Sequence, residues 1–351
     1  MNKYLIRLIK YLLPSFIFCI MLLIMSHTTA SASGETSADT HRGIWFSYTD
    51  FEEAGLYNKT ETQFRKKANK IFKKIKKYNF NAIYFHVRPF DDAVYPNSEF
   101  KWCTYMSDKP LSYDPLAIMI EYANAYDIDF HAWINPYRIT HTKIYNPAKQ
   151  KVTDRIVRGV MEIIQNYDVD GIHFDDYFYP SKKKGNQFFK VKKRERKNNI
   201  NKMVSSVYQA IKAYNPEIAF GISPAGTVAY AESLGCDLET WLGEEGYVDY
   251  IVPQIYWSNN YISEGKKVKL FNDRLNEWMS IGTGNTPVYT GLALYKAGYQ
   301  SSIDRGWKKS RTNIEKQINR SFKKGAQGYV MFTYKSLYLP DAKNEMKFLK
   351  N

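Results

Sequence analysis

The chain has 351 residues, 44% of them hydrophobic, which is enough to bury the core of one large domain. Its formal net charge is +15, so the surface attracts polyanions such as wall polymers, anionic lipids or acidic glycans. The sequence contains no nucleic-acid recognition module, and we expect no nucleic-acid partner.

The first 32 residues are typical of a secretory signal peptide. A charged region with Lys3, Arg7 and Lys10 precedes the apolar run 16–25, and Ala30-Ser31-Ala32 is a small-residue cleavage site. Residues 33–40 are small and polar and predict a flexible mature N-terminus. We therefore expect a secreted or envelope-associated protein folded over 41–351. An uncleaved membrane anchor is the alternative, although the uncharged run is short and contains Pro14.

Cysteine and histidine usage excludes several kinds of site. Beyond the leader, Cys103 and Cys236 are far apart, so they are no disulfide framework and are expected to be free. Neither zinc-ligand spacing nor a glycine-rich phosphate loop is present. The sequence thus predicts no metal and no cofactor.

Strand and helix patterns alternate along the rest of the chain. Alternating apolar and polar residues predict strands at 43–48, 81–87, 129–135, 169–175, 218–223, 250–256, 288–294 and 328–334. Helical periodicity predicts helices at 63–78, 114–126, 153–167, 199–214, 237–242, 270–279 and 312–324, with Asp114 as an N-cap before Pro115. Pro253 argues against regular pairing in the middle of its strand. This order predicts a single-domain (β/α)8 TIM barrel.

Polar and aromatic residues gather where the predicted strands end. They are Asp50, Arg88, Asn135, Asp175, Ser223, Tyr256 and Tyr334. A barrel brings such residues into a ring at one mouth, whereas an open sheet concentrates its site at one switch point. The distribution favours the closed barrel.

The segment 169–180, VDGIHFDDYFYP, supplies the first candidate catalytic group. Ile172 and Phe174 alternate with His173 and Asp175, so Asp175 points into the barrel at the carboxyl end of its strand. Asp176 is adjacent and points inward only if the strand gives way to a loop there. A carboxylate at a barrel mouth is costly unless it has a partner or a function.

Glycosidic cleavage needs a second carboxyl group, and several candidates remain open. They are Asp176, Asp50, Asp91 and Asp92. Arg88, or His173 when protonated, is expected to hold Asp175 ionised, and Arg88 alternatively binds a sugar carboxylate or is a structural partner of a buried carboxylate. Asn135, Gln254 and Tyr256 offer groups that bind sugar hydroxyls. Tyr137, Tyr177, Trp257, Trp133 and Tyr179 have rings suited to stacking on pyranose faces, although Trp133, like His131, is expected mainly to fill the barrel interior.

The run Lys182–Lys197 holds much of the excess positive charge. One interpretation is a solvated loop and helix start, and the other is contact with an anionic wall polymer, because the run follows the Asp175 strand.

The strand-end motifs together resemble the glycosyl-hydrolase-like family ten proteins, which are secreted or envelope-anchored bacterial barrels. The motifs are RGIWFSYTDF, FHVRPFDDAVYP, AWINPYR, VDGIHFDDYFYP, FGISPAG, VDYIVPQIYW and GLALYK, in order from about His41 to Tyr338. The resemblance implies a TIM-barrel glycoside hydrolase acting on peptidoglycan glycan strands or a related extracellular amino-sugar polymer. The segment between Pro180 and Asn199 is shorter and more basic than that family's usual insertion.

Two catalytic patterns are similar to the Asp175 strand. In α-amylase-type barrels an Asp at this place attacks the sugar, whereas in chitinase-type strands, DGIDIDWEYP, inward aspartates steer the substrate's N-acetyl group and a Glu is the acid. Tyr177 occupies the place of that Glu here. We therefore expect a glycoside hydrolase that uses strand-end aspartates as nucleophile or base and as acid. The competing hypothesis is an inactive barrel that binds wall glycan or anionic polymer.

Overall fold

The computed structural model describes residues 40–180, 188, 190–281, 284, 286–308 and 311–349. The predicted signal peptide and the segment 33–39 lie outside these residues, as do 181–187 and 189 of the basic run. Among the described helices, none has both the length and the apolar character needed to cross a membrane.

Within the described chain, eight parallel strands form one sheet in the order β11-β12-β1-β2-β5-β6-β7-β8. They are β1 (His41–Phe46), β2 (Ala82–Arg88), β5 (Asp129–Ile134), β6 (Gly171–Asp175), β7 (Ala219–Ser223), β8 (Tyr250–Ile251), β11 (Tyr289–Leu292) and β12 (Gly328–Met331). The two edges meet through parallel bridges from Ile251 to Val288 and from Gln254 to Gly291. These bridges close the sheet, and the predicted TIM barrel is confirmed.

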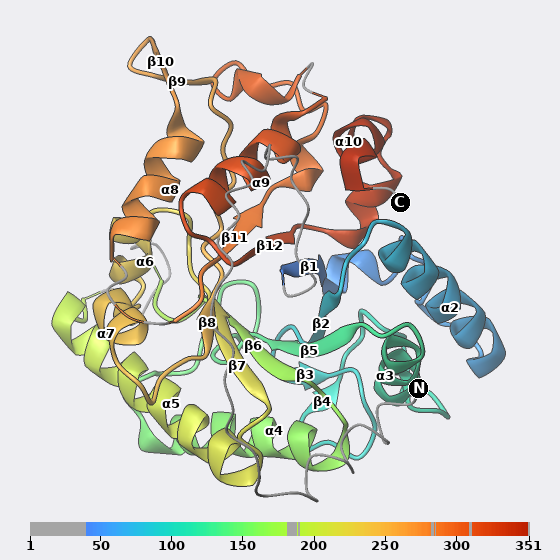
Figure 1. Cartoon of the computed structure of the whole chain (residues 1–351). Helices are drawn as coiled ribbons and strands as arrows, with labels where there is room; N and C mark the ends of the chain where they lie inside the picture. The colour runs from blue at the N-terminus through green and yellow to red at the C-terminus, as the bar shows by residue number, and fades with distance from the viewer. Residues whose placement is uncertain are drawn as a thin grey trace, which may run out of the picture. The chain divides into compact units, whose positions relative to one another are not determined.

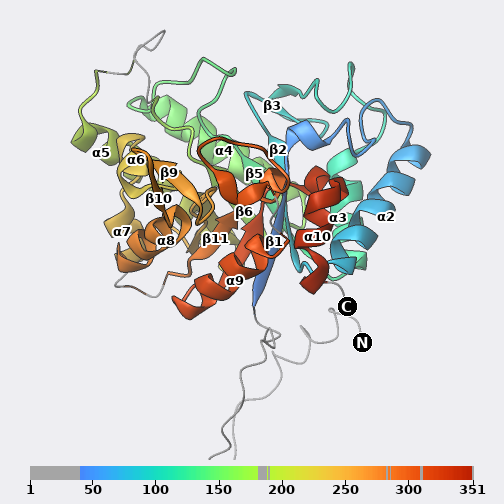
Figure 2. The same cartoon turned by 90° about the horizontal axis from the view of Figure 1, so that it is seen from above.

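Helices cover the outside of the strand ring (Figure 1). They are α2 (Glu61–Lys77), α3 (Pro115–Ala125), α4 (Gln150–Asn166), α5 (Lys193–Tyr214), α6 (Val228–Ser233), α7 (Leu238–Gly243), α8 (Leu270–Ile281), α9 (Asn313–Lys323) and α10 (Pro340–Glu345). Asp114 caps α3 by accepting from the amides of Leu116 and Ala117, as predicted. Two short pairings lie outside the barrel sheet, β3 (Asp92–Ala93) with β4 (Lys101–Trp102), and β9 (Tyr261–Ser263) with β10 (Lys266–Val268). In Figure 2, β3 lies beyond the carboxyl end of β2, on the side of the barrel opposite the start of β1.

Strand alternation sorts the side chains into two cores. Ile172 and Phe174 join the large apolar core beneath the helices, whereas His173 and Asp175 point into the barrel. A smaller core inside the barrel contains Trp45, Tyr84, Trp133, Tyr250, Val252 and Val330. The alternation predicted for β6 is therefore confirmed.

A β-bulge interrupts the alternation at the end of β2. His86 pairs with Trp133, but the next partner, Ile134, pairs with Arg88, so β2 uses one extra residue. Ile134 belongs to the large apolar core between the strands and the helices, which we call the outer core. Arg88 lies on the same side of the sheet as Ile134. The bulge thus turns Arg88 away from the barrel interior, where strict alternation had placed it.

Most boundaries differ by one to three residues from the sequence expectation, and those of β8 and α5 differ the most. Strand β8 ends at Ile251, because Pro253 has no amide hydrogen for a ladder bond. Beyond it, Gln254 forms only isolated bridges to Ala225 and Gly291. Helix α5 begins at Lys193, earlier than the predicted Asn199. The basic run therefore ends inside a helix.

A hydrogen-bonded chain of aromatic residues fills the barrel below Asp175. The Trp45 indole donates to His173 Nε2 (3.3 Å), so His173 carries its proton on Nδ1, which contacts the Tyr250 hydroxyl (3.2 Å). Tyr250 also contacts His131 Nδ1 (3.0 Å). Burial lowers the pKa of His131 to about 3 and that of His173 well below its usual value, so both imidazoles are neutral. His131 and Trp133 fill the interior, as expected.

The close approach of Gly221 to Tyr250 generates a stability prediction. A Cβ on Gly221 would stand 2.2 Å from the Tyr250 ring, which is held between two histidines. Gly221→Ala is therefore expected to lower the free energy of unfolding by about 1–3 kcal/mol, measured by urea denaturation. Gln209→Ala on the exposed face of α5 is the control and should change it by less than about 0.5 kcal/mol. An unchanged free energy for Gly221→Ala would contradict the rigid packing described.

Candidate active site

Two adjacent carboxyl groups lie at the carboxyl end of β6. Asp175 ends the strand, and its Oδ1 accepts hydrogen bonds from the Asp176 amide (3.0 Å) and from Gln254 Nε2 (3.1 Å). Asp176 belongs to the loop, and its Oδ2 accepts from the Ala225 amide (2.6 Å). The pKa of each carboxyl group also depends on the other side chain. The chain turns after Asp175, so neighbours that would face opposite sides of a strand share one site.

Burial decides the protonation of this pair. Desolvation raises the pKa of Asp175 to about 6, although the Asp176 amide, the Arg138 cation and Gln254 oppose the shift. Desolvation, together with the charge of Asp175, raises the pKa of Asp176 well above its usual value. At neutral pH, Asp176 holds a proton and Asp175 is ionised. The pair therefore offers one proton donor and one carboxylate.

Arg138 is the cation that acts on Asp175, and sequence reasoning missed it. Its guanidinium stacks on Tyr177 (4.1 Å to the ring centroid) and Phe90 (4.9 Å) and donates to His141 Nδ1 (3.4 Å). The motif AWINPYR ends at Arg138, so its position just after β5 was an available signal. Strand alternation favoured Arg88 because it cannot anticipate a bulge.

Arg88 lies in the outer layer, and its predicted role beside Asp175 or a sugar is wrong. Its guanidinium stacks on Phe100 (3.2 Å to the centroid) and approaches Gly159 of α4. The side chain is buried, and desolvation lowers its pKa. Arg88 therefore packs the barrel wall against α4.

His173 does not supply the positive charge predicted for it. It is fully buried, and it is neutral because burial lowers its pKa. His86 and Trp133 lie level with His173 on the adjacent strands β2 and β5, and their rings stack at a centroid distance of 3.8 Å. Both ring nitrogens of His86, and Trp133 Nε1, have no hydrogen-bond partner among the described residues. These unsatisfied polar atoms lie level with His173, one step along the strands below Asp175.

Gln254 and Asn135 are mainly positioning residues. Gln254 Nε2 donates to Asp175 and to the Ser223 carbonyl (2.9 Å), which fixes the Asp175 carboxylate. Asn135 Nδ2 donates to the Pro89 carbonyl (2.7 Å), and its amide donates to the Arg88 carbonyl (2.9 Å). Asn135 thus secures the bulged end of β2 against β5. Its side-chain oxygen Oδ1 has no hydrogen-bond partner among the described residues.

The predicted stacking residues divide between mouth and core. Tyr177 is 47% exposed, and the charge of Asp175 raises its pKa. Tyr256 is half-buried beside Trp45 and the exposed Tyr295, and its pKa is raised by burial and by neighbours that include Asp175. Both rings line the mouth.

Three aromatic side chains lie in the outer core instead. Tyr137 is fully buried beside Phe178, so its predicted stacking on a sugar is wrong. Trp257 is half-buried against Gly226 and the outer core. Tyr334 packs on Phe46 at a centroid distance of 4.8 Å, so it is not part of the predicted ring of residues at the mouth.

The remaining candidate carboxylates, Asp50, Asp91 and Asp92, lie away from the Asp175–Asp176 pair and have other contacts. Asp50 is fully buried and accepts from the Ser47 amide (2.7 Å) and Thr333 Oγ1 (2.9 Å), and burial raises its pKa to about 7. It joins the ends of β1 and β12 and cannot reach a sugar. Asp91 forms an ion pair with Arg155 (2.8 Å) and accepts from the Tyr145 hydroxyl (2.6 Å). Asp91 and Asp92 both line a pocket next to the mouth, and desolvation raises the pKa of Asp92.

Part of the basic run is bound to the barrel itself. Lys193 pairs with Glu232 (2.6 Å), and Lys197 pairs with Glu232 (3.0 Å) and Asp237 (3.1 Å). These two lysines fasten the start of α5, so they are not the ones available to a polymer. Cys103 and Cys236 are both free and buried, as expected. In the described ranges, no group of three or more His, Cys, Asp or Glu side chains could hold a metal ion.

Sequence comparison identifies one family. The sequence profile of the family described as Glycosyl hydrolase-like 10 matches residues 40–144 and 137–309. Glycosyl hydrolase YngK of Bacillus subtilis is 31% identical over 76% of this chain, and the match spans 62% of that protein. Glycosyl hydrolase DigH of Escherichia coli K12 is 27% identical over 79% of this chain and 78% of its own length.

Solved structures share the fold at low sequence identity. The glycoside hydrolase domain of PgaB (BpsB) from Bordetella bronchiseptica has a TM-score of 0.60 and 10% identity, covering 89% of this chain and 99% of that one. A family 18 N-acetylglucosaminidase from Paenibacillus barengoltzii has a TM-score of 0.58 and 11% identity, covering 88% and 99%. Both similarities support the barrel architecture.

The electrostatic setting of Asp175 can be tested directly. Arg138→Met removes the nearby cation that favours ionisation, so the pKa of Asp175 should move upward from about 6. The measurement is a pH titration of the aspartate carboxyl carbons by 13C NMR. Arg155→Met, which removes a cation paired with Asp91, is the control and should leave Asp175 unchanged. A downward shift, or equal shifts in both variants, would refute the assignment of Arg138.

Proposed function

Because this chain belongs to the glycosyl hydrolase-like 10 family, we propose that it is a glycoside hydrolase acting on an extracellular amino-sugar polymer, with peptidoglycan glycan strands as its substrate. We also propose that it works outside the cytoplasm, as the predicted signal peptide implies. The chain matches 62% of the length of the B. subtilis relative.

The observation that carries the proposal is the Asp175–Asp176 pair. Glycosidic cleavage needs a proton for the leaving oxygen and a negative charge to stabilise the positive charge that develops on the sugar. One protonated and one ionised carboxyl group side by side supply both. No other aspartate named above combines such a state with a place in the mouth.

The closeness of the two groups favours one form of the reaction. The two carboxyl groups belong to adjacent residues and act on each other, which favours one acid and one supporting carboxylate over a second carboxylate that attacks the sugar from its opposite face. An amino-sugar substrate can supply the nucleophile itself, through the oxygen of its 2-acetamido group. This chemistry resembles that of chitinase-type barrels, with Asp176 replacing the acid that Tyr177 cannot provide.

In the first step, the acetamido oxygen bonds to the anomeric carbon, the bond from that carbon to the glycosidic oxygen breaks, and Asp176 gives its proton to the leaving oxygen. The Asp175 carboxylate stabilises the acetamido N–H. Water next attacks the anomeric carbon, breaks the bond to the acetamido oxygen and returns a proton to Asp176. Because the anomeric carbon is attacked twice from opposite faces, the product retains its configuration.

The surroundings of the pair suit a glycan. Tyr177 and Tyr256 offer aromatic faces, and Arg138 offers guanidinium hydrogen bonds next to Asp175. The alternative function is an inactive barrel that binds wall glycan or anionic polymer. Its supporting observation is the net charge of +15, and it predicts retention on cell wall without product, weakened by salt.

The activity prediction concerns Asp175. Wild-type protein incubated with purified wall glycan, intact and stripped of stem peptides, should release new reducing ends, with products identified by mass spectrometry. Asp175→Asn should lower this rate by about a thousandfold or more, because the negative charge is lost. Asp154→Asn on the exposed part of α4 is the matched control and should retain wild-type activity. Retention on wall without any product from wild type would favour the inactive barrel.

The role of Asp176 has its own test. Asp176→Asn keeps an amide that can donate to Asp175 and an oxygen that can accept from Ala225, but it removes the transferable proton. The variant should lose activity on wall glycan yet keep much of it on a 2,4-dinitrophenyl N-acetylglucosaminide, whose leaving group needs no proton. Equal loss on both substrates would argue against Asp176 as the acid.

A further inference from the structure

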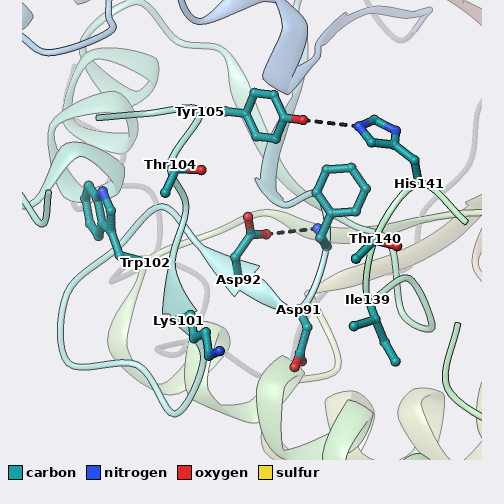
Figure 3. A pocket seen from close by; sticks show the side chains of 10 residues that line it. Asp91, Asp92, Lys101, Trp102, Thr104, Tyr105, Ile139, Thr140 and His141 are labelled. Carbon is teal, nitrogen blue, oxygen red and sulfur yellow. Dashed lines mark hydrogen bonds between the residues drawn. The ribbon is translucent and has the colours of Figure 1, made fainter. Parts of the chain in front are cut away.

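A pocket of about 350 Å³ lies beside the barrel mouth. One wall is formed by β3, β4 and the residues after them, including Asp92, Lys101, Trp102 and Tyr105. The opposite wall is the loop after β5, with Thr140 and His141. Figure 3 shows these side chains around a common opening, with Tyr105 and His141 joined at one end. The volume falls within the range of small-ligand sites.

The lining groups match the chemistry of a sugar. Trp102 is half-buried, and its indole is fixed by hydrogen bonds to the Ser107 carbonyl (3.0 Å) and hydroxyl (3.1 Å). Tyr105 is 38% exposed. Lys101 is exposed and forms no ion pair with any described residue. An aromatic platform fixed in place, with hydroxyl and ammonium donors beside it, is suited to a pyranose and its polar substituents.

Shared walls connect this pocket to the carboxyl pair. The Tyr48 ring lies 4.6 Å from Tyr105 and 5.4 Å from His86. Burial raises the pKa of Tyr48, the Arg138 cation opposes this shift, and the charges of Asp175 and Asp92 add to it. Tyr48 thus contacts the pocket residue Tyr105 on one side and His86 of the barrel on the other, so the pocket adjoins the barrel mouth.

A second link runs through Arg138. Because an arginine only donates, its contact with His141 Nδ1 (3.4 Å) leaves the His141 proton on Nε2, where it donates to the Tyr105 hydroxyl oxygen (3.1 Å). The hydroxyl hydrogen of Tyr105 is then free to donate elsewhere. The cation beside Asp175 and the wall of the pocket thus belong to one hydrogen-bonded unit.

We propose that this pocket is a distal glycan-binding site, which holds an N-acetylated amino-sugar unit of the same polymer chain whose cleavage point lies at Asp175. This proposal rests on the proposed function. Trp102 stacks on the sugar ring, and Lys101 and the Tyr105 hydroxyl bind its substituents. A chain must be long enough to reach both places, so the pocket favours long strands over short fragments.

The test measures binding in the Asp175→Asn background, which prevents turnover. The probes are β-1,4-linked N-acetylglucosamine dimers and hexamers, and affinity is measured by titration calorimetry. Trp102→Ala removes the platform. Thr104→Trp fills the pocket from an exposed position and keeps the test valid if Trp102→Ala fails to fold. Tyr214→Ala, an exposed tyrosine at the end of α5, is the control.

Each pocket variant should lower the ratio of hexamer to dimer affinity about tenfold, whereas the control should not. Equal hexamer affinity in all variants, or no hexamer binding by the Asp175→Asn protein itself, would overturn the distal site. A tenfold loss in the pocket variants, with no product from wild type on wall glycan, would instead overturn the hydrolase and keep the pocket as a glycan-binding site.

Discussion

The burial of two neighbouring carboxyl groups at the end of β6 is the constraint on which the site depends. Two carboxylates in contact and away from water cannot both be ionised at neutral pH, because desolvation and mutual repulsion both favour one shared proton. Arg138 and Gln254 favour the charge on Asp175. The Ala225 amide donates to Asp176 and lowers its pKa, but desolvation and the charge of Asp175 outweigh this contact. An acid and a carboxylate are thereby maintained together before any substrate arrives.

The barrel interior is consistent with that arrangement because it adds no charge of its own. His131 and His173 are neutral, and the Tyr250 hydroxyl lies between them, so polar groups deep in the barrel satisfy one another. Arg138 therefore acts on Asp175 without a competing cation below. The unsatisfied nitrogens of His86 and Trp133 lie one layer beneath, where a ligand or water can meet them.

On the outer side, the same arginine connects the aromatic residues of the mouth with those of the neighbouring loop. Arg138 stacks on Tyr177 and Phe90 and contacts His141, so it connects the mouth to the wall of the neighbouring pocket. The exposed Tyr295 lies beside Tyr256, and the exposed Tyr105 lies beside Tyr48. Aromatic faces of this kind bind sugars with little loss of side-chain entropy, since each ring is already held by a neighbour.

Sequence alone determined the alternation of strands and helices, the closed barrel, and Asp175 as the inward carboxylate of β6. These follow from a side-chain period of two, which any regular strand obeys. The family resemblance could also be predicted from sequence, because its motifs lie at strand ends. The same holds for the positions of Tyr177 and Tyr256 at the mouth. Tertiary structure alone decided what happens where regular geometry stops. A bulge in β2 turned Arg88 outward, so that Arg138 is the cation near Asp175. Asp50 forms hydrogen bonds that join β1 to the segment after β12. The loop after Asp175 places Asp176 beside its neighbour. Each outcome depends on contacts between distant segments, which a local pattern does not encode.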